Sequence, residues 1–294
     1  MPCPYISFLL EILTWFTSGQ QSINMNAYLK SIIHFSLFFM KKDIKSRFAG
    51  SALGIVWLVI QPICLILIYF FVFSSVLKIR LSSDIGTNSF LVFLLIDLFP
   101  WLAFQEGCIR AATSIIDNAE AVKKIPFPLE SLPIGVILSC FCIHFSAFFI
   151  FVLGYLGYDF FFQNHVLNLV GARHALLLPV YVFFQLIMTI GIGFFFAAFC
   201  TYLRDLAQVF NILFQVWFYA TPIVYPLSMV PDRLKTIIQL NPLTSLIQIY
   251  RDLLLAYRLS LDIYNFIAIL FPVLCFFIGS YIFIKLKKGF ADVL

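Results

Sequence analysis

The chain has 294 residues, of which 62% are hydrophobic and 11% are charged, and its formal net charge is +5. So low a charged fraction excludes a water-soluble domain with an ordinary charged surface. The chain must therefore lie in lipid. Its long apolar runs are continuous rather than alternating, which favours spanning helices over a β-barrel.

Residues 1–24 are apolar and aromatic, with Glu11 as their only charge. A secretory signal peptide has a basic start and a cleavage site of small residues. Neither is clear here, so we predict no cleaved signal. Because an amphipathic run begins at Asn26, Met25 is an alternative translation start, a hypothesis that N-terminal sequencing of the native protein would test.

A basic amphipathic segment follows at residues 32–47. Its apolar residues recur at helical spacing, and its basic residues are Lys41, Lys42, Lys45 and Arg47. This pattern predicts an interfacial helix, with Ile33, Leu37, Met40 and Ile44 on its apolar side. Anchoring by lipid phosphates is a sufficient explanation of the basic residues.

Six apolar runs predict six spanning helices in an all-α integral membrane fold. They lie at about residues 53–77, 90–104, 132–155, 176–200, 206–225 and 266–284. We expect a cytoplasmic segment over residues 1–51 and one transmembrane domain over residues 52–294. Pro62 should kink the first span, and the Gly50 to Gly54 spacing permits close helix approach.

Lys and Arg concentrate before the first span, between spans 2 and 3, and after span 6. By the positive-inside rule, both termini are predicted to be cytoplasmic. The net positive charge then needs no nucleic-acid partner to explain it.

Two further segments predict short helices. Residues 106–132 contain good helix formers followed by Pro126 and Pro128, which indicates a short cytoplasmic helix and then a rigid turn. Residues 227–240 and 244–255 are too short or too polar to span, so we expect two re-entrant or outer helices joined at Asn241-Pro242. If these helices lie at the outer face, the charges of Arg251 and Asp252 are tolerated because they are exposed to water.

No motif for covalent chemistry is present. The sequence holds no phosphate-binding loop, nucleophile elbow or His-Glu-x-x-His helix. Its seven cysteines are scattered in apolar runs and form no Cys-x-x-Cys pair, and its four histidines lack ligand spacing. We therefore predict no metal site, and any ATP must bind to another chain.

Asp97 is the one carboxylate well inside a predicted span, so by default it faces the interior or a polar partner. It supports a rival class, a proton-coupled flippase or secondary transporter with Asp97 as relay, although no inverted repeat is visible. A membrane-embedded transferase is a third class, but Asp159, His165 and His174 are too dispersed for it. Glu106 and Arg110 are expected to pair on one helix face.

Three motifs carry a family resemblance. Residues 43–62 hold a charged run, Gly-Ser-x-Leu-Gly-x-x-Trp and then Pro62; residues 118–128 hold Asn-x-x-x-Val-Lys-Lys and a Phe-Pro ending; Asn241-Pro242 is followed by Tyr250-Arg251. The chain resembles the ABC-2 type exporter permeases, in particular those of polysaccharide and O-antigen export. Phe48-Ala49 departs from the family's usual Tyr and basic residue, which weakens a role for a basic residue there.

The resemblance implies a function and a set of partners. Two permease copies would pair with two ABC ATPase subunits that bind ATP and Mg, and together they would export a lipid-linked polysaccharide across the cytoplasmic membrane. O-antigen is the favoured substrate, with capsule, teichoic acid, lipid or drug export as alternatives within the fold. The interfacial helix would help to hold the ATPase.

The resemblance also implies roles for individual residues. The ATPase-coupling residues would be Asn118, Glu120, Val122, Lys123, Lys124, Phe127 and Pro128. The wall of the translocation path, in spans 1 and 5, would include Trp57, Gln61, Tyr69, Trp217, Tyr219 and Tyr225, although a membrane-interface aromatic belt explains any one of these aromatics equally well. The outer gate helices would carry Asn241, Pro242 and Arg251.

Overall fold

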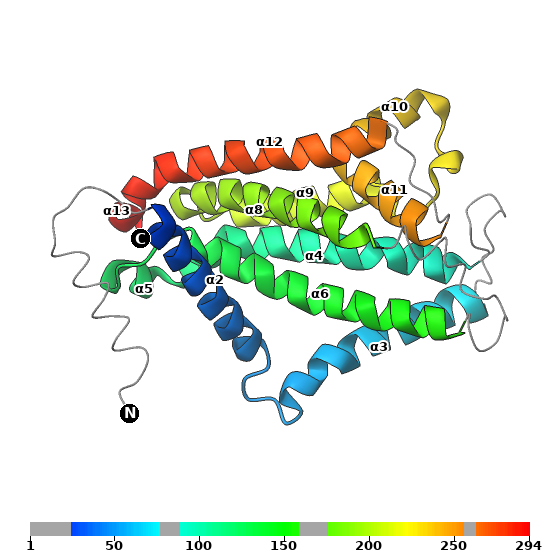
Figure 1. The fold of residues 1–294 in the computed structure, drawn as a ribbon, viewed down its shortest axis with the longest axis horizontal. Helices are drawn as coiled ribbons and strands as arrows, with labels where there is room; N and C mark the ends of the chain where they lie inside the picture. Colours follow the sequence, from blue (N-terminus) through cyan, green and yellow to red (C-terminus); the bar gives the residue numbers. More distant parts are fainter. Residues whose placement is uncertain (1–24, 77–88, 159–175, 256–262) are drawn as a thin grey trace.

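Four long helices lie side by side and form the body of the molecule (Figure 1). They are α4 (Phe90–Asp117), α6 (Ser131–Tyr158), α8 (Leu178–Tyr202) and α12 (Ile263–Leu286). The structure is a computed structural model, and it describes residues 25–76, 89–158, 176–255 and 263–294. Within these residues α4 packs against both α6 and α8, and α8 packs against α12.

These four helices are the ones in the described part of the chain that are long and apolar enough to cross a membrane. Two shorter apolar helices accompany them, α3 (Trp57–Tyr69), which continues as the π-helical turn η2 (Phe70–Val76), and α9 (Leu206–Ala220). The all-helical fold is therefore confirmed and is consistent with a membrane protein, and the count of six spans stays a prediction.

Two helices end elsewhere than the predicted spans. α4 continues thirteen residues past Phe104 to Asp117, because the charges of Glu106 and Arg110 are paired within the protein and do not end the helix. α9 ends at Ala220 rather than at Tyr225. Pro222 has no backbone N–H and disfavours a helical residue before it, so Thr221 has extended backbone angles and the helix ends before it.

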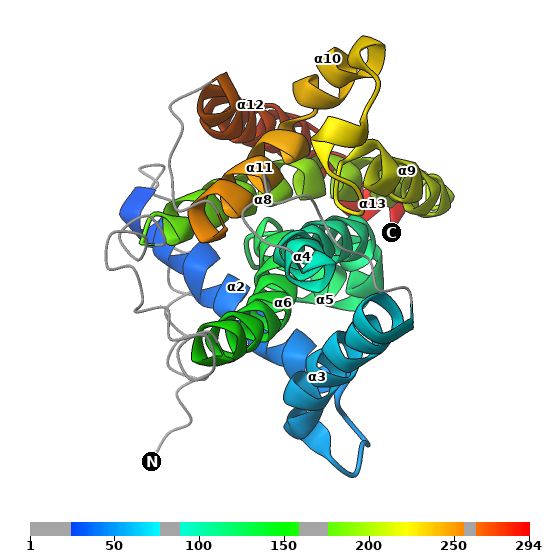
Figure 2. The ribbon, with the colours of Figure 1, turned by 90° about the vertical axis from the view of Figure 1, so that its right-hand side faces the viewer.

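The remaining helices gather at the two ends of the bundle (Figure 1). At one end lie the start of α2 (Met25–Arg47), the short α5 (Ala119–Lys124) and the C-terminal α13 (Phe290–Val293), which follows η6 (Lys287–Gly289). At the other end lie α10 (Asp232–Leu240), preceded by η5 (Leu227–Met229), and α11 (Pro242–Leu254). Figure 2 looks at this second end, where α11 lies between α12 and α4.

The helix α2 is longer than predicted and packs along α6. Its buried side chains include Ser36 and Phe39, while Ile33 and Leu37, the predicted apolar side, are exposed. Arg47 also points inward, so of the four basic residues predicted for the interfacial segment Lys41, Lys42 and Lys45 form an exposed basic edge. The helix thus has one side on the protein and a separate apolar side left open.

The Gly50 to Gly54 spacing does not mark a helix contact, which corrects that prediction. Both glycines have positive φ, 78° and 51°, in the turn between α2 and α3. Only glycine adopts this conformation without strain. The close glycine contact of this fold is elsewhere, between Gly191 of α8 and Gly279 of α12, where an added Cβ would meet backbone atoms.

Candidate functional site

The site begins with α5, the short helix that connects α4 to α6 through residues 118–130. Glu120, Lys123 and Lys124 are exposed, and Glu120 forms a 3.1 Å ion pair with Lys124. Ile125 is 47% exposed beside them. The predicted short helix is confirmed, as is its stop before Pro126, since Ile125 has extended backbone angles.

The other predicted coupling residues face the protein and hold this segment in place. The Asn118 side-chain oxygen accepts a 2.9 Å hydrogen bond from Lys42 of α2, and its amide donates to the Ser114 carbonyl. Val122, Phe127 and Leu129 pack against a buried cluster that includes Phe39 and Leu132. The segment therefore has a fixed inner side and an exposed outer edge.

The Phe-Pro ending is anchored on α2. The ring of Phe127 lies 5.7 Å from Phe35 and 5.3 Å from Phe39, measured between ring centroids. Pro128 is half-buried, and its carbonyl accepts from the Ser131 hydroxyl at the start of α6. This contact explains why an aromatic residue stands at the end of the loop.

A third anchor joins three distant parts of the chain. Tyr28 of α2 donates to Glu130 at 3.2 Å, and Lys287 near the C-terminus forms an ion pair with the same carboxylate. Burial raises the pKa of the Tyr28 phenol above its ordinary value, and the Glu130 charge raises it further. Tyr28 therefore keeps its proton, and with it this hydrogen bond, throughout the neutral range.

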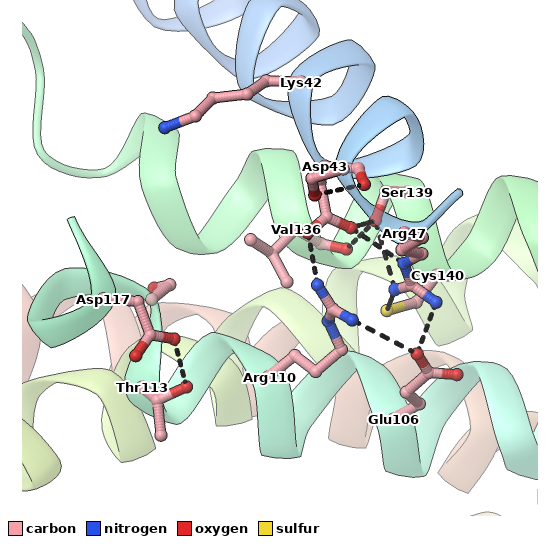
Figure 3. A network of polar contacts seen from close by, with 12 residues as sticks. Lys42, Asp43, Arg47, Glu106, Arg110, Thr113, Asp117, Val136, Ser139 and Cys140 are labelled. Atoms are coloured by element: carbon pink, nitrogen blue, oxygen red, sulfur yellow. Dashed lines mark hydrogen bonds and ion pairs between the residues drawn. The ribbon is translucent and has the colours of Figure 1, made fainter. Parts of the chain in front are cut away.

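An ion network joins α2 to α4 and α6 (Figure 3). Arg47 lies 3.1 Å from Asp43 and 2.5 Å from Glu106. Arg110 pairs with Asp43 and lies 3.9 Å from Glu106, so the predicted pair with Glu106 is confirmed as its weaker contact. Two carboxylates thus meet two guanidinium groups, which lets these charges lie within the packed helices.

Side chains of α6 complete the network. Ser139 donates to Asp43, His144 lies 2.6 Å from Glu106, and the Arg47 guanidinium lies 3.0 Å from the Cys140 sulfur. A cavity of about 430 Å³ opens next to it between α2, α4 and α6. Lys42 and Arg110 balance Asp43 and Asp117 in its wall, so the wall itself has no preference for an anion.

The predicted path residues lie on α3, α9 and the turn after α9, and they do not converge in this chain. Gln61 and Tyr219 are exposed, whereas Tyr69 stacks on Phe73 at 5.8 Å and is half-buried. Trp57 bonds to Ser51, and Tyr225 bonds to the Tyr219 carbonyl. Trp101 of α4 is 1% exposed and belongs to the core.

The Asn-Pro motif caps a helix. The Asn241 side-chain oxygen accepts from the Leu243 N–H at 3.1 Å, so Asn241 is the N-cap of α11 and Pro242 is its first residue. The same oxygen accepts from Trp217 of α9 at 3.1 Å. The predicted turn between two short helices is confirmed, and the hydrogen bond from Trp217 joins α9 to this turn.

The prediction that Arg251 and Asp252 face water was wrong. They are 5% and 7% exposed, and Arg251 forms an ion pair with Asp97 of α4. The buried charges of Arg251 and Asp97 are tolerated because they neutralise each other. The sequence contained both partners, one carboxylate inside a span and the Arg of the Tyr-Arg motif, but no spacing rule connects positions 154 residues apart.

Sequence similarity to known proteins assigns the chain to a protein family. Residues 36–255 match the ABC-2 type transporter family. Because the match covers most of the chain, the protein belongs to this family of transporter membrane subunits.

Among the described residues, no group of three or more His, Cys, Asp or Glu is placed to hold a metal ion.

Three relatives show which kinds of transport protein the chain is similar to. The chain is 31% identical over 280 residues to the O-antigen export system permease protein RfbA of Klebsiella pneumoniae, covering 93% of this chain and 100% of that protein. It is 29% identical to a Myxococcus xanthus protein of the same name over 75% and 80% of the two chains. The polysialic acid transport protein KpsM of Escherichia coli is 23% identical over 81% of this chain and 88% of its own length.

Proposed function

We propose that this chain is the permease subunit of an ABC exporter that moves a lipid-linked polysaccharide, O-antigen, across the cytoplasmic membrane. Its full-length likeness to O-antigen export permeases supports the substrate class. ATP and Mg bind to a separate ATPase subunit, and two copies of the permease form the membrane part. The chain spans the membrane six times, and both termini are cytoplasmic.

The observation that carries the coupling role is the construction of the α5 segment. Its inner residues are tied to α2, α4 and the C-terminal end, while its outer edge of Glu120, Lys123, Lys124 and Ile125 is exposed. Because these contacts fix the segment, a displacement of a protein docked on its outer edge is transmitted to α4 and α6. The ATPase therefore docks on this edge, and α2 serves as the support of the edge.

The other predicted roles follow from the same arrangement. The exposed basic edge of α2, at Lys41, Lys42 and Lys45, contacts lipid phosphates at the cytoplasmic surface. The exposed residues of α3 and α9, including Gln61 and Tyr219, form the wall of the path when two copies meet. The helices α10 and α11, with Asn241 and Pro242, shape the outer exit.

A capsule polysaccharide is the second candidate substrate, because polysialic acid transport proteins are also similar to this chain, at lower identity. Proton coupling through Asp97 has lost its main support, since that carboxylate pairs with Arg251. The two polysaccharide substrates share one mechanism, so the coupling test below applies to both.

The test is co-purification of the tagged chain with its ATPase from native membranes in mild detergent. Lys123→Glu reverses a charge on the exposed edge of α5, and Arg233→Glu makes the same change on α10 at the opposite end. We expect Lys123→Glu to lower the bound ATPase roughly tenfold, equivalent to about 1.4 kcal/mol of binding free energy, and Arg233→Glu to leave it unchanged. Equal retention of the ATPase by both variants would refute docking at α5.

A further inference from the structure

The side chain of Arg251 fastens α11 directly to α4. Its Nε lies 2.7 Å from Asp97 Oδ2, and its Nη2 contacts the same oxygen and the Pro222 carbonyl, the latter at 2.5 Å. The guanidinium carbon lies 3.8 Å from the centroid of the Phe93 ring, also in α4. Arg251 is 5% exposed and Asp97 is fully buried, so this ion pair is closed to solvent within the chain.

The neighbouring Tyr250 fastens α11 to the same part of α4 through α8. Its hydroxyl donates to Gln185 Oε1 at 2.6 Å, and Gln185 Nε2 donates to the Pro100 carbonyl at 2.7 Å. Tyr250 and Gln185 are 0% and 1% exposed. The bridge therefore runs from α11 through α8 to α4 by direct hydrogen bonds between buried groups.

Both connections end on one turn of α4, because Asp97 and Pro100 are three residues apart. From Asp97 the helix continues through Pro100 to Asp117, where Asn118 leads into α5. These 20 residues span about 30 Å at 1.5 Å per residue, roughly the thickness of the hydrocarbon core. Figure 1 shows α4 running between the end that holds α5 and the end that holds α10 and α11.

We propose that Tyr250 and Arg251 are positioning residues for transport, which make α10 and α11 follow the movement that the ATPase imposes on α4. This inference rests on the proposed function. If α4 moved while α11 stayed, Asp97 and Arg251 would be left as separate buried charges, and Gln185 would lose either Tyr250 or the Pro100 carbonyl as a partner. Such separation is costly, so the two helices move as one body.

The experiment compares three variants of the full chain in complex with its ATPase. Tyr250→Phe removes only the hydroxyl that reaches Gln185. The double variant Asp97→Asn with Arg251→Met removes both charges together, so neither is left unpaired. Tyr264→Phe is the matched control, because its hydroxyl accepts a 2.7 Å hydrogen bond from Gln239 and so joins α12 to α10 rather than α11 to α4. The readouts are bound ATPase, ATP hydrolysis, glycan export, and hydrogen–deuterium exchange of residues 242–254.

We expect Tyr250→Phe and the double variant to keep the ATPase and ATP hydrolysis but to lower export roughly tenfold, with faster exchange in α11. Tyr264→Phe should match the wild type. Unchanged export, or unchanged exchange in α11, in both test variants would overturn the proposal. Loss of the bound ATPase in Tyr250→Phe would also overturn it, because the contact would then serve folding alone.

Failure of the proposed function has a different signature. A wild-type chain that binds no ATPase or exports no glycan refutes that function before any variant is compared. The exchange measurement still reports whether Tyr250 and Arg251 hold α11, since it needs neither ATP nor substrate.

Discussion

The crossing of α8 and α12 allows a quantitative test of the packing. A Cβ added at Gly279 would lie 1.9 Å from the Gly191 carbonyl oxygen, and one added at Gly191 would lie 2.4 Å from the Cys275 carbonyl oxygen. These are backbone atoms, so no side-chain rotation relieves the overlap. To bring 1.9 Å to the 3.4 Å of ordinary contact, the helices must separate locally by about 1.5 Å.

We therefore expect Gly279→Ala to lower the free energy of unfolding by about 3 kcal/mol, at the upper end of overpacking costs, because the separation also removes dispersion contacts along the crossing. Gly154→Ala in α6 is the control, since an added Cβ there meets nothing within 4 Å. Alanine is the better helix former by roughly 1 kcal/mol, so this control should be neutral or stabilising.

The assay is thermal unfolding of the detergent-purified protein. A loss of 3 kcal/mol in a chain of this length lowers the melting temperature by roughly 5 to 10 °C. If Gly279→Ala melted at the same temperature as Gly154→Ala, the close approach of α8 and α12 would be refuted.

Three further substitutions test the site and the outer turn. Phe127→Ala removes the ring that packs on α2 and should cost about 2 kcal/mol, seen as faster proteolysis between α5 and α6; unchanged cleavage would contradict the anchor. Glu106→Gln leaves Arg47 and His144 without their shared carboxylate and should cost about 2 kcal/mol in thermal unfolding, whereas an unchanged melting temperature would count against the network. Asn241→Ala removes the α11 cap and should cost about 1 kcal/mol, with faster hydrogen exchange at Leu243 as its local sign; slow exchange there would show that the cap is dispensable.

The elements were predictable where apolar runs and prolines mark them. Three of the six predicted spans, those near residues 132–155, 176–200 and 266–284, coincide within a few residues with α6, α8 and α12. The short helix before Pro126 and the turn at Asn241-Pro242 also followed from local rules. Such features depend on neighbouring residues, which a single sequence displays directly.

The contacts between distant residues were not predictable in the same way. Glu106 and Arg110 suggested the end of a span, yet they are neutralised by Asp43 and Arg47 of α2, and the helix continues. Arg251 suggested a wet surface, yet its partner is a carboxylate 154 residues earlier. A charge in an apolar segment implies a partner but does not identify it, because the identity depends on how the helices are arranged.

The glycines also show that a spacing in the sequence does not identify a contact between helices. The spacing of Gly50 and Gly54 matched a helix-packing motif, but their positive φ values place them in a turn. Gly191 and Gly279 have no such spacing in the sequence, and only the crossing of α8 with α12 brings them together. A small-residue motif is therefore informative only once both of its helices are known.

The central claim is that this chain exports a lipid-linked polysaccharide with the help of a separate ATPase. Its most direct test is deletion of the gene in the native host, followed by measurement of surface polysaccharide and of lipid-linked glycan retained inside the cell. We predict that surface O-antigen disappears, that the lipid-linked glycan accumulates inside, and that the wild-type gene restores both. Normal surface polysaccharide in the deletion strain, with no internal accumulation, would contradict the claim.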